Sequence, residues 1–133
     1  MNLHRHIRVV IVEGSAIVRV RLAEALGETP NVQLIDSVDS EQAALRLLRS
    51  SEWNVIVLDL QLREGTGFGI LKALGGLRPE GTKVVVFTHY VSAAYRERCL
   101  KLGADYFFDK AREFHRVRDV LAQMAAPGSS PLH

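Results

Sequence analysis

Short apolar runs alternate five times with stretches of helical periodicity along this chain of 133 residues. The apolar runs, rich in valine, isoleucine and phenylalanine, cover residues 7–12, 32–38, 54–59, 83–88 and 105–109. The helical patterns cover residues 15–26, 40–50, 67–77, 92–102 and 112–125. Alternation of this kind predicts an α/β fold in which parallel strands are joined by helices that cover both faces of one sheet.

The composition of each run predicts its place in that sheet. Four runs are continuously apolar, as strands covered on both faces should be, whereas the run 32–38 mixes apolar with polar residues and is placed at an edge. Right-handed crossovers leave few strand orders. We predict a single three-layer, doubly wound domain of flavodoxin-like type, with a five-stranded parallel sheet in the order 2-1-3-4-5. Its topological switch point lies between strands one and three.

Length and composition bound the class of protein. We expect one domain over residues 1–126, followed by a flexible tail or truncated linker at 127–133, where two prolines prevent a helix. The formal net charge of only +2 gives no indication of direct nucleic-acid binding. The single cysteine, Cys99, fits a cytoplasmic location. No apolar stretch approaches the ~20 residues that cross a bilayer, so we expect no membrane contact.

Four polar side chains stand where predicted strands end: Glu13, Asp59, Thr88 and Lys110. The carboxyl ends of parallel strands meet at one edge of a sheet, so these side chains should converge there. A carboxylate can hold a phosphoryl group as an acyl phosphate. The amine and the hydroxyl can bind its oxygens, and a magnesium ion can neutralise the remaining charge. Asp59 is the expected acceptor because the glycine-bearing loop 60–67 follows it.

On these residues the chain resembles the receiver domain of two-component response regulators, of which the chemotaxis regulator is a single-domain form. The resemblance extends over about residues 7–125. Its motifs are Val9-Val10-Ile11-Val12-Glu13, Val55-Ile56-Val57-Leu58-Asp59-Leu60, Gly65-Thr66-Gly67, Val86-Phe87-Thr88 and Gly103-Ala104-Asp105-Tyr106-Phe107-Phe108-Asp109-Lys110. Each motif is weak alone, but their order and spacing together are highly specific.

The resemblance implies a bacterial signalling domain rather than an enzyme, with at most self-catalysed phosphotransfer and dephosphorylation. Asp59 would accept a phosphoryl group from a phosphohistidine on a sensor histidine kinase or a histidine phosphotransfer protein. Glu13, Asp59 and the main-chain carbonyl of Gln61 would hold magnesium. Thr88 and Phe107 would then switch inward, and the face formed by the fourth helix, fifth strand and fifth helix would bind a downstream protein. A homodimer is also compatible with the sequence.

One departure from the family pattern bears directly on the metal. Receivers usually carry two adjacent acids after the first strand, whereas this chain has Glu13 followed by Gly14. Losing a charged ligand should weaken magnesium binding. Two interpretations stay open at this point. The chain is either a receiver that still accepts a phosphoryl group on Asp59, or a degenerate pseudo-receiver that acts as a phosphorylation-independent protein-interaction module.

Other departures concern access to the site and the loop after the fifth strand. His89 and Tyr90 follow Thr88, and we expect them to shield the site from small phosphodonors and water, which predicts a long-lived phosphoryl group. Ala111 replaces a usual proline, and the Lys110–Ala111 peptide should be trans because a non-proline cis bond costs ~3–4 kcal/mol. A flavodoxin-like small-molecule binder shares the predicted strand order. It is disfavoured because no loop after the first strand is rich in serine, threonine and glycine.

Overall fold

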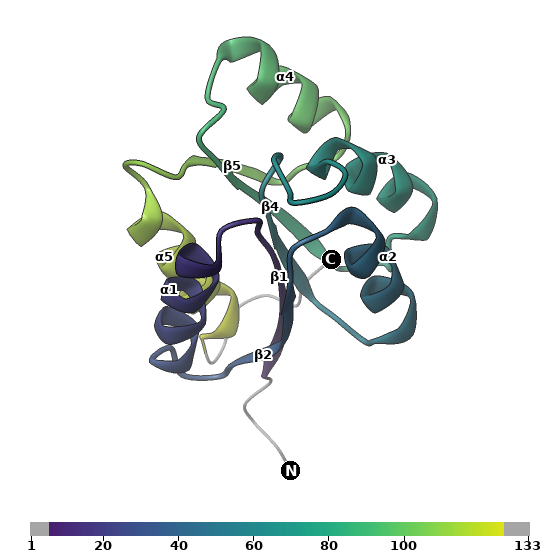
Figure 1. Ribbon diagram of the computed structural model, residues 1–133. Coiled ribbons are helices and arrows are strands. Elements are labelled where there is room, and N and C mark those ends of the chain that lie inside the picture. The colour runs from purple at the N-terminus through teal and green to yellow at the C-terminus, as the bar shows by residue number, and fades with distance from the viewer. Residues whose placement is uncertain (1–5, 127–133) are drawn as a thin grey trace.

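The computed structural model describes residues 6–126, in which five strands alternate with five helices (Figure 1). The strands are β1 (Ile7–Val12), β2 (Val32–Val38), β3 (Val55–Leu58), β4 (Lys83–Thr88) and β5 (Tyr106–Asp109). The helices are α1 (Ala16–Gly27), α2 (Glu41–Ser50), α3 (Gly67–Leu77), α4 (Ala93–Lys101) and α5 (Phe114–Ala125). Each strand begins and ends within one residue of its predicted bounds.

The strands form one parallel sheet in the order β2-β1-β3-β4-β5, as predicted. The mixed strand β2 lies at an edge and is only partly buried. Helices α1 and α5 cover one face of the sheet, and α2, α3 and α4 lie on the other (Figure 1). The three-layer, flavodoxin-like architecture is therefore confirmed. No helix in the range 6–126 is long and apolar enough to span a bilayer.

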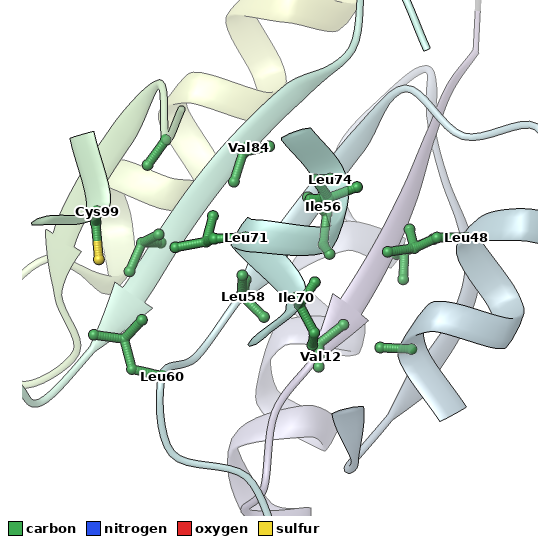
Figure 2. Close-up of a cluster of buried hydrophobic side chains, with 14 of the residues drawn as sticks. Val12, Leu48, Ile56, Leu58, Leu60, Ile70, Leu71, Leu74, Val84 and Cys99 are labelled. Atoms are coloured by element: carbon green, nitrogen blue, oxygen red, sulfur yellow. The ribbon is translucent and has the colours of Figure 1, made fainter. Parts of the chain in front are cut away.

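Two hydrophobic cores hold the sheet between its helix layers. Successive side chains of a strand point to opposite faces, so Val10 and Val12 pack toward α2 and α3 while Val9 and Ile11 pack toward α1 and α5. Figure 2 shows the first core. Its labelled members are Val12, Leu48, Ile56, Leu58, Leu60, Ile70, Leu71, Leu74, Val84 and Cys99. Burial on both faces fixes the strands, and therefore the residues at their ends.

Helix starts follow local capping chemistry. Each of the first four helices is capped by a hydroxyl oxygen that accepts a hydrogen bond from the main-chain N–H three residues later. The capping residues are Ser15, Ser40, Thr66 and Ser92. At the start of α2 the cap is Ser40, and the neighbouring Asp39 pairs with Arg63 at 3.3 Å. Helix α5 begins two residues later than predicted, because turns at Asp109 occupy the intervening residues.

The predicted tail at 127–133 lies outside the described residues, as do residues 1–5. The domain boundary near residue 126 therefore stays a prediction. The described part ends with α5 at Ala125 and one further residue, Ala126.

Candidate functional site

Main-chain hydrogen bonds carry the sheet one residue beyond the strands and fix three of the predicted site residues. The N–H of Glu13 donates to the last carbonyl of β2 at 2.9 Å, and that of Asp59 to the last carbonyl of β1 at 2.9 Å. The N–H of Lys110 donates to the carbonyl of Thr88 at 2.8 Å. All four residues thus stand at the carboxyl edge of the sheet, where the strand order predicted them.

Lys110 joins the two acids. Its Nζ lies 2.6 Å from Glu13 Oε1 and 2.6 Å from Asp59 Oδ2, and the three side chains are 7%, 3% and 8% exposed. The other carboxylate oxygens accept main-chain bonds, Glu13 Oε2 from Ser15 at 2.9 Å and Asp59 Oδ1 from Leu60 at 2.7 Å. One buried ammonium therefore faces two buried carboxylates, and the cluster can attract further positive charge.

Burial raises the pKa of the Glu13 carboxyl above its ordinary value of 4.5. Hydrogen bonds from Lys110 and from the Ser15 N–H favour the charged form and act in the opposite direction, while the neighbouring Asp59 charge adds to the rise. The carboxyl of Glu13 therefore holds its proton more tightly in the folded protein than a solvent-exposed glutamate does.

A cavity of about 340 Å³ opens beside the cluster. Its lining comprises Glu13, Gly14, Ser15, Val18, Asp59, Gln61, Leu62, Arg63, His89 and Lys110. Asp59 and Lys110 both belong to this lining, so a small charged group that enters the cavity comes next to both residues. The cavity therefore gives the predicted acceptor access from outside.

The oxygen donors at this cavity fit a magnesium ion that keeps several waters. They are the carboxylates of Glu13 and Asp59 and the main-chain carbonyl of Gln61, which are hard ligands of the kind magnesium takes. Within residues 6–126 no group of three or more histidine, cysteine, aspartate or glutamate side chains is placed to hold a metal. The donor set is thus two carboxylates and one carbonyl.

Gly14 brings the β3–α3 loop close to the end of β1. A Cβ atom at Gly14 would lie 3.2 Å from the carbonyl oxygen of Gln61 and 3.4 Å from Leu62 Cα. The first contact is tight and the second is close to ordinary van der Waals distance, so a side chain at this position requires the Gln61 carbonyl to move by a few tenths of an ångström. The main chain of the β3–α3 loop therefore passes close to the position where receivers usually carry a second acid.

The remaining predicted residues border the site without joining the cluster. Thr88 is fully buried, and its hydroxyl accepts the Tyr90 N–H at 3.1 Å. Thr88 does not belong to the part of the cavity lining that residues 6–126 form. His89 lines the cavity, and the Tyr90 hydroxyl donates to Gln61 Oε1 at 2.6 Å. Phe107 is 6% exposed and packs in the core beneath α3 and α4.

Some contacts of the site were not predicted from the sequence. The Ser15 N–H binds Glu13, and Arg19 Nη1 donates to the Glu13 carbonyl at 2.8 Å. Ser15 carried a signal as a helix cap, whereas the position of Arg19 depends on the direction in which α1 leaves the sheet. The Lys110–Ala111 peptide is trans, as predicted, since no cis bond occurs in the described range.

Comparison with known proteins decides the family. The family model described as the response regulator receiver domain matches residues 9–122. The chain belongs to this receiver family. Receiver domains are generally regulatory rather than enzymatic, and they typically bind magnesium.

Curated relatives of this receiver are longer proteins. It is 27% identical over 109 residues to the Fimbriae Z protein of Salmonella typhimurium, covering 82% of this chain and 51% of that protein. It is 30% identical over 112 residues to protein-glutamate methylesterase/protein-glutamine glutaminase 1 of Xanthomonas campestris, covering 84% of this chain and 31% of that protein. The receiver thus spans about half of the first relative and a third of the second.

Solved receiver structures share the fold. The response regulator domain of Thermotoga maritima CheB superposes with a TM-score of 0.77 at 24% identity, covering 88% of this chain and 91% of that one. A CheY-like receiver from Methanospirillum hungatei superposes with a TM-score of 0.71 at 19% identity, covering 86% of this chain and 93% of that one. RcsB from Salmonella enterica, solved bound to the promoter rprA, superposes with a TM-score of 0.80 at 18% identity. The match covers 91% of this chain and 69% of that one. These identities support a common fold, and no shared partner follows from them.

Proposed function

We propose that this receiver accepts a phosphoryl group on Asp59, in the cytoplasm, from a phosphohistidine of a sensor histidine kinase or a histidine phosphotransfer protein. The supporting observation is that the Asp59 carboxylate lines an open cavity and lies 2.6 Å from the Lys110 ammonium. A carboxylate oxygen attacks phosphorus and the phosphorus–nitrogen bond breaks. The imidazole nitrogen keeps that electron pair and binds a proton. Lys110 neutralises charge on the transferred group.

We propose that Glu13, Asp59 and the Gln61 carbonyl hold magnesium for this transfer. When bound, the ion supplies positive charge beside the phosphoryl oxygens. The chain offers one carboxylate fewer than the usual receiver, because Gly14 replaces the second acid. Its affinity for magnesium should therefore be lower than that of a receiver with three acids.

We infer that Thr88 and Phe107 carry the switch. The Thr88 hydroxyl accepts the Tyr90 N–H, and its own O–H proton is the group that would be donated to a phosphoryl oxygen. Phe107 contacts α4 through Arg96, whose guanidinium lies 5.7 Å from the ring centroid and donates to the Phe107 carbonyl at 3.5 Å. Helix α4 buries only Cys99, so a small change beneath it can move the helix.

We propose the α4–β5–α5 face as the surface that binds a downstream protein. Its exposed candidates are Tyr95, Arg96, Lys101, Arg112 and Arg116. Arginine and tyrosine are enriched in protein interfaces, which supports this assignment. A second copy of the receiver is a further candidate for the same face.

The phosphohistidine donor needs a docking surface beside the cavity mouth, and we propose that α1 provides it. Ile17 and Val20 lie one turn apart on the outer face of α1 and are 75% and 56% exposed. They follow Gly14 and Ser15, which line the cavity. A donor that covers these apolar side chains brings its histidine toward Asp59.

A phosphorylation-independent role is the second candidate. It is favoured by Gly14, which stands where receivers usually carry a second metal-binding acid. In that role the α4–β5–α5 face would bind its partner without any change at Asp59.

Intact mass spectrometry separates the two candidates. The receiver is incubated with magnesium and phosphoramidate, then with acetyl phosphate, beside the control Asp59→Asn. One phosphoryl adduct on the unchanged chain alone supports the acceptor role. If no adduct forms with either donor, a panel of phosphorylated histidine kinases is tried next, because His89 and Tyr90 border the site. Failure with these donors as well would overturn the acceptor role in favour of the second candidate.

A further inference from the structure

The loop that carries Gln61 is joined to the start of α2. The Arg63 N–H donates to the Asp39 carbonyl at 3.0 Å, and the Glu41 N–H donates to the Glu64 carbonyl at 3.0 Å. Ser40 and Glu64 thus form a short parallel bridge outside the main sheet. This pairing connects the first turn of α2 to the β3–α3 loop.

The side chain of Glu41 strengthens this connection. Its Oε1 accepts the Thr66 N–H at 2.9 Å, at the N-terminal end of α3 where a carboxylate is favoured. Two glycines make room for the carboxylate. A Cβ atom at Gly65 or at Gly69 would approach Glu41 side-chain atoms closer than 3.0 Å. Gly65 also has a φ of +80°, which other residues adopt only under strain.

The first turn of α3 carries this contact on to Asp59. Gly67 follows Thr66, and its N–H donates to the Leu60 carbonyl at 2.9 Å. A Cβ atom at Gly67 would collide with the main-chain carbonyl of Asp59. Glu41 therefore reaches the backbone of the phosphoryl acceptor through Thr66 and Gly67.

We propose that Glu41 is a positioning residue for the Asp59 site. It holds the β3–α3 loop so that the Gln61 carbonyl stays against Gly14 and the Leu60 N–H stays on the Asp59 carboxylate. Its importance for metal binding rests on the proposed function. With only two carboxylates at the site, a metal depends more on the Gln61 carbonyl, and a loop ordered in advance loses less entropy on binding.

The matched variants are Glu41→Ala, Glu41→Gln and Gln42→Ala. Glutamine keeps an oxygen that can accept the Thr66 N–H, so it should rescue the contact. Gln42 is an exposed neighbour on the same helix turn and serves as the control. We expect amide hydrogen exchange of Leu60 and Gln61 in the metal-free protein to accelerate several-fold in Glu41→Ala. Exchange should be unchanged in the other two variants, and β1 and β4 amides should be unchanged in all three.

A double-mutant cycle with Gly69→Ala tests the packing by a separate route. Alanine for glycine within a helix normally stabilises. Here we expect Gly69→Ala to lower the urea midpoint when Glu41 is present and to raise it in Glu41→Ala. Additive effects would show that the carboxylate does not occupy this position and would overturn the proposal.

Magnesium titration by calorimetry separates this proposal from the proposed function. If the unchanged chain binds magnesium, Glu41→Ala should bind several-fold more weakly and Glu41→Gln with nearly unchanged affinity. If the unchanged chain binds none, the magnesium assignment fails, and amide exchange alone decides the role of Glu41. Unchanged exchange at Leu60 and Gln61 in Glu41→Ala would overturn the positioning role in either case.

Discussion

The hydroxyl of Tyr90 donates a 2.6 Å hydrogen bond to the side-chain oxygen of Gln61 and so joins the β4–α4 and β3–α3 loops beside the cavity at Asp59. The main chain of the same tyrosine donates to the Thr88 hydroxyl. Tyr90 therefore contacts one residue expected to switch and the loop expected to hold the metal.

Tyr90→Phe should shorten the lifetime of the phosphoryl group on Asp59. The variant keeps the ring but loses the bond to Gln61, and a hydrogen bond worth about 1 kcal/mol corresponds to a roughly fivefold change in rate. This lifetime is measured by intact mass spectrometry as the loss of the phosphoryl adduct over time. Tyr95→Phe is the control, because the Tyr95 hydroxyl makes no hydrogen bond within residues 6–126. Equal lifetimes in Tyr90→Phe and the unchanged chain would count against a shielding role.

Lys110→Met should lower the free energy of unfolding at pH 7. It leaves two buried carboxylates without their cation, a change that typically costs roughly 3–5 kcal/mol. The loss should be smaller at pH 5, because burial raises the pKa of Glu13 and its protonation weakens the repulsion between the Glu13 and Asp59 carboxylates. Urea unfolding at both pH values provides the measurement. Lys101→Met removes only an exposed pair with Glu97 and should have almost no effect. An equal loss at both pH values would contradict this account.

Glu13→Gln should change how stability depends on pH. The raised pKa means that folded Glu13 binds its proton more tightly than unfolded Glu13. The free energy of unfolding should therefore fall as pH rises from 4.5 through the raised pKa, and then level off. This decrease should be absent from the variant. Urea titrations between pH 4 and pH 8 test the difference, and parallel curves would rule out a raised pKa for Glu13.

Gly14→Asp should strengthen magnesium binding and destabilise the metal-free protein. A third carboxylate adds repulsion to Glu13 and Asp59, and its Cβ lies 3.2 Å from the Gln61 carbonyl. Magnesium should then raise the melting temperature more in Gly14→Asp than in the unchanged chain. Gly14→Asn has similar volume without the charge and should show the steric cost alone. Equal magnesium shifts in both variants would show that charge at this position does not matter.

Ile17→Glu should slow phosphotransfer from a histidine kinase while leaving phosphorylation by phosphoramidate unchanged. The proposed donor contact buries this apolar side chain, whereas the small donor needs only the cavity. Leu77→Glu, an exposed apolar residue at the end of α3, is the matched control. Slower reaction with both donors would indicate damage to the site instead of loss of docking.

The sheet and the convergence of Glu13, Asp59 and Lys110 were predictable because they depend on local patterns. Each apolar run ends at a polar residue, and parallel strands bring such ends to one edge. The contact between Tyr90 and Gln61 was not predictable, because it depends on how two loops leave different strands. The contact between Glu41 and Thr66 was not predictable either, because the two residues are 25 positions apart in the sequence and lie at the starts of different helices. The late start of α5 reflects competition between turns at Asp109 and the helix.

The main-chain bonds that fix Glu13, Asp59 and Lys110 involve atoms common to every amino acid except proline, which lacks the N–H. Mutation can therefore exchange a side chain at the carboxyl edge while the backbone keeps its path. The chemistry at this edge can therefore change through single side-chain substitutions that leave these main-chain bonds in place. The fold of a receiver and the chemistry of its site can thus vary independently, because backbone atoms hold one and side chains supply the other.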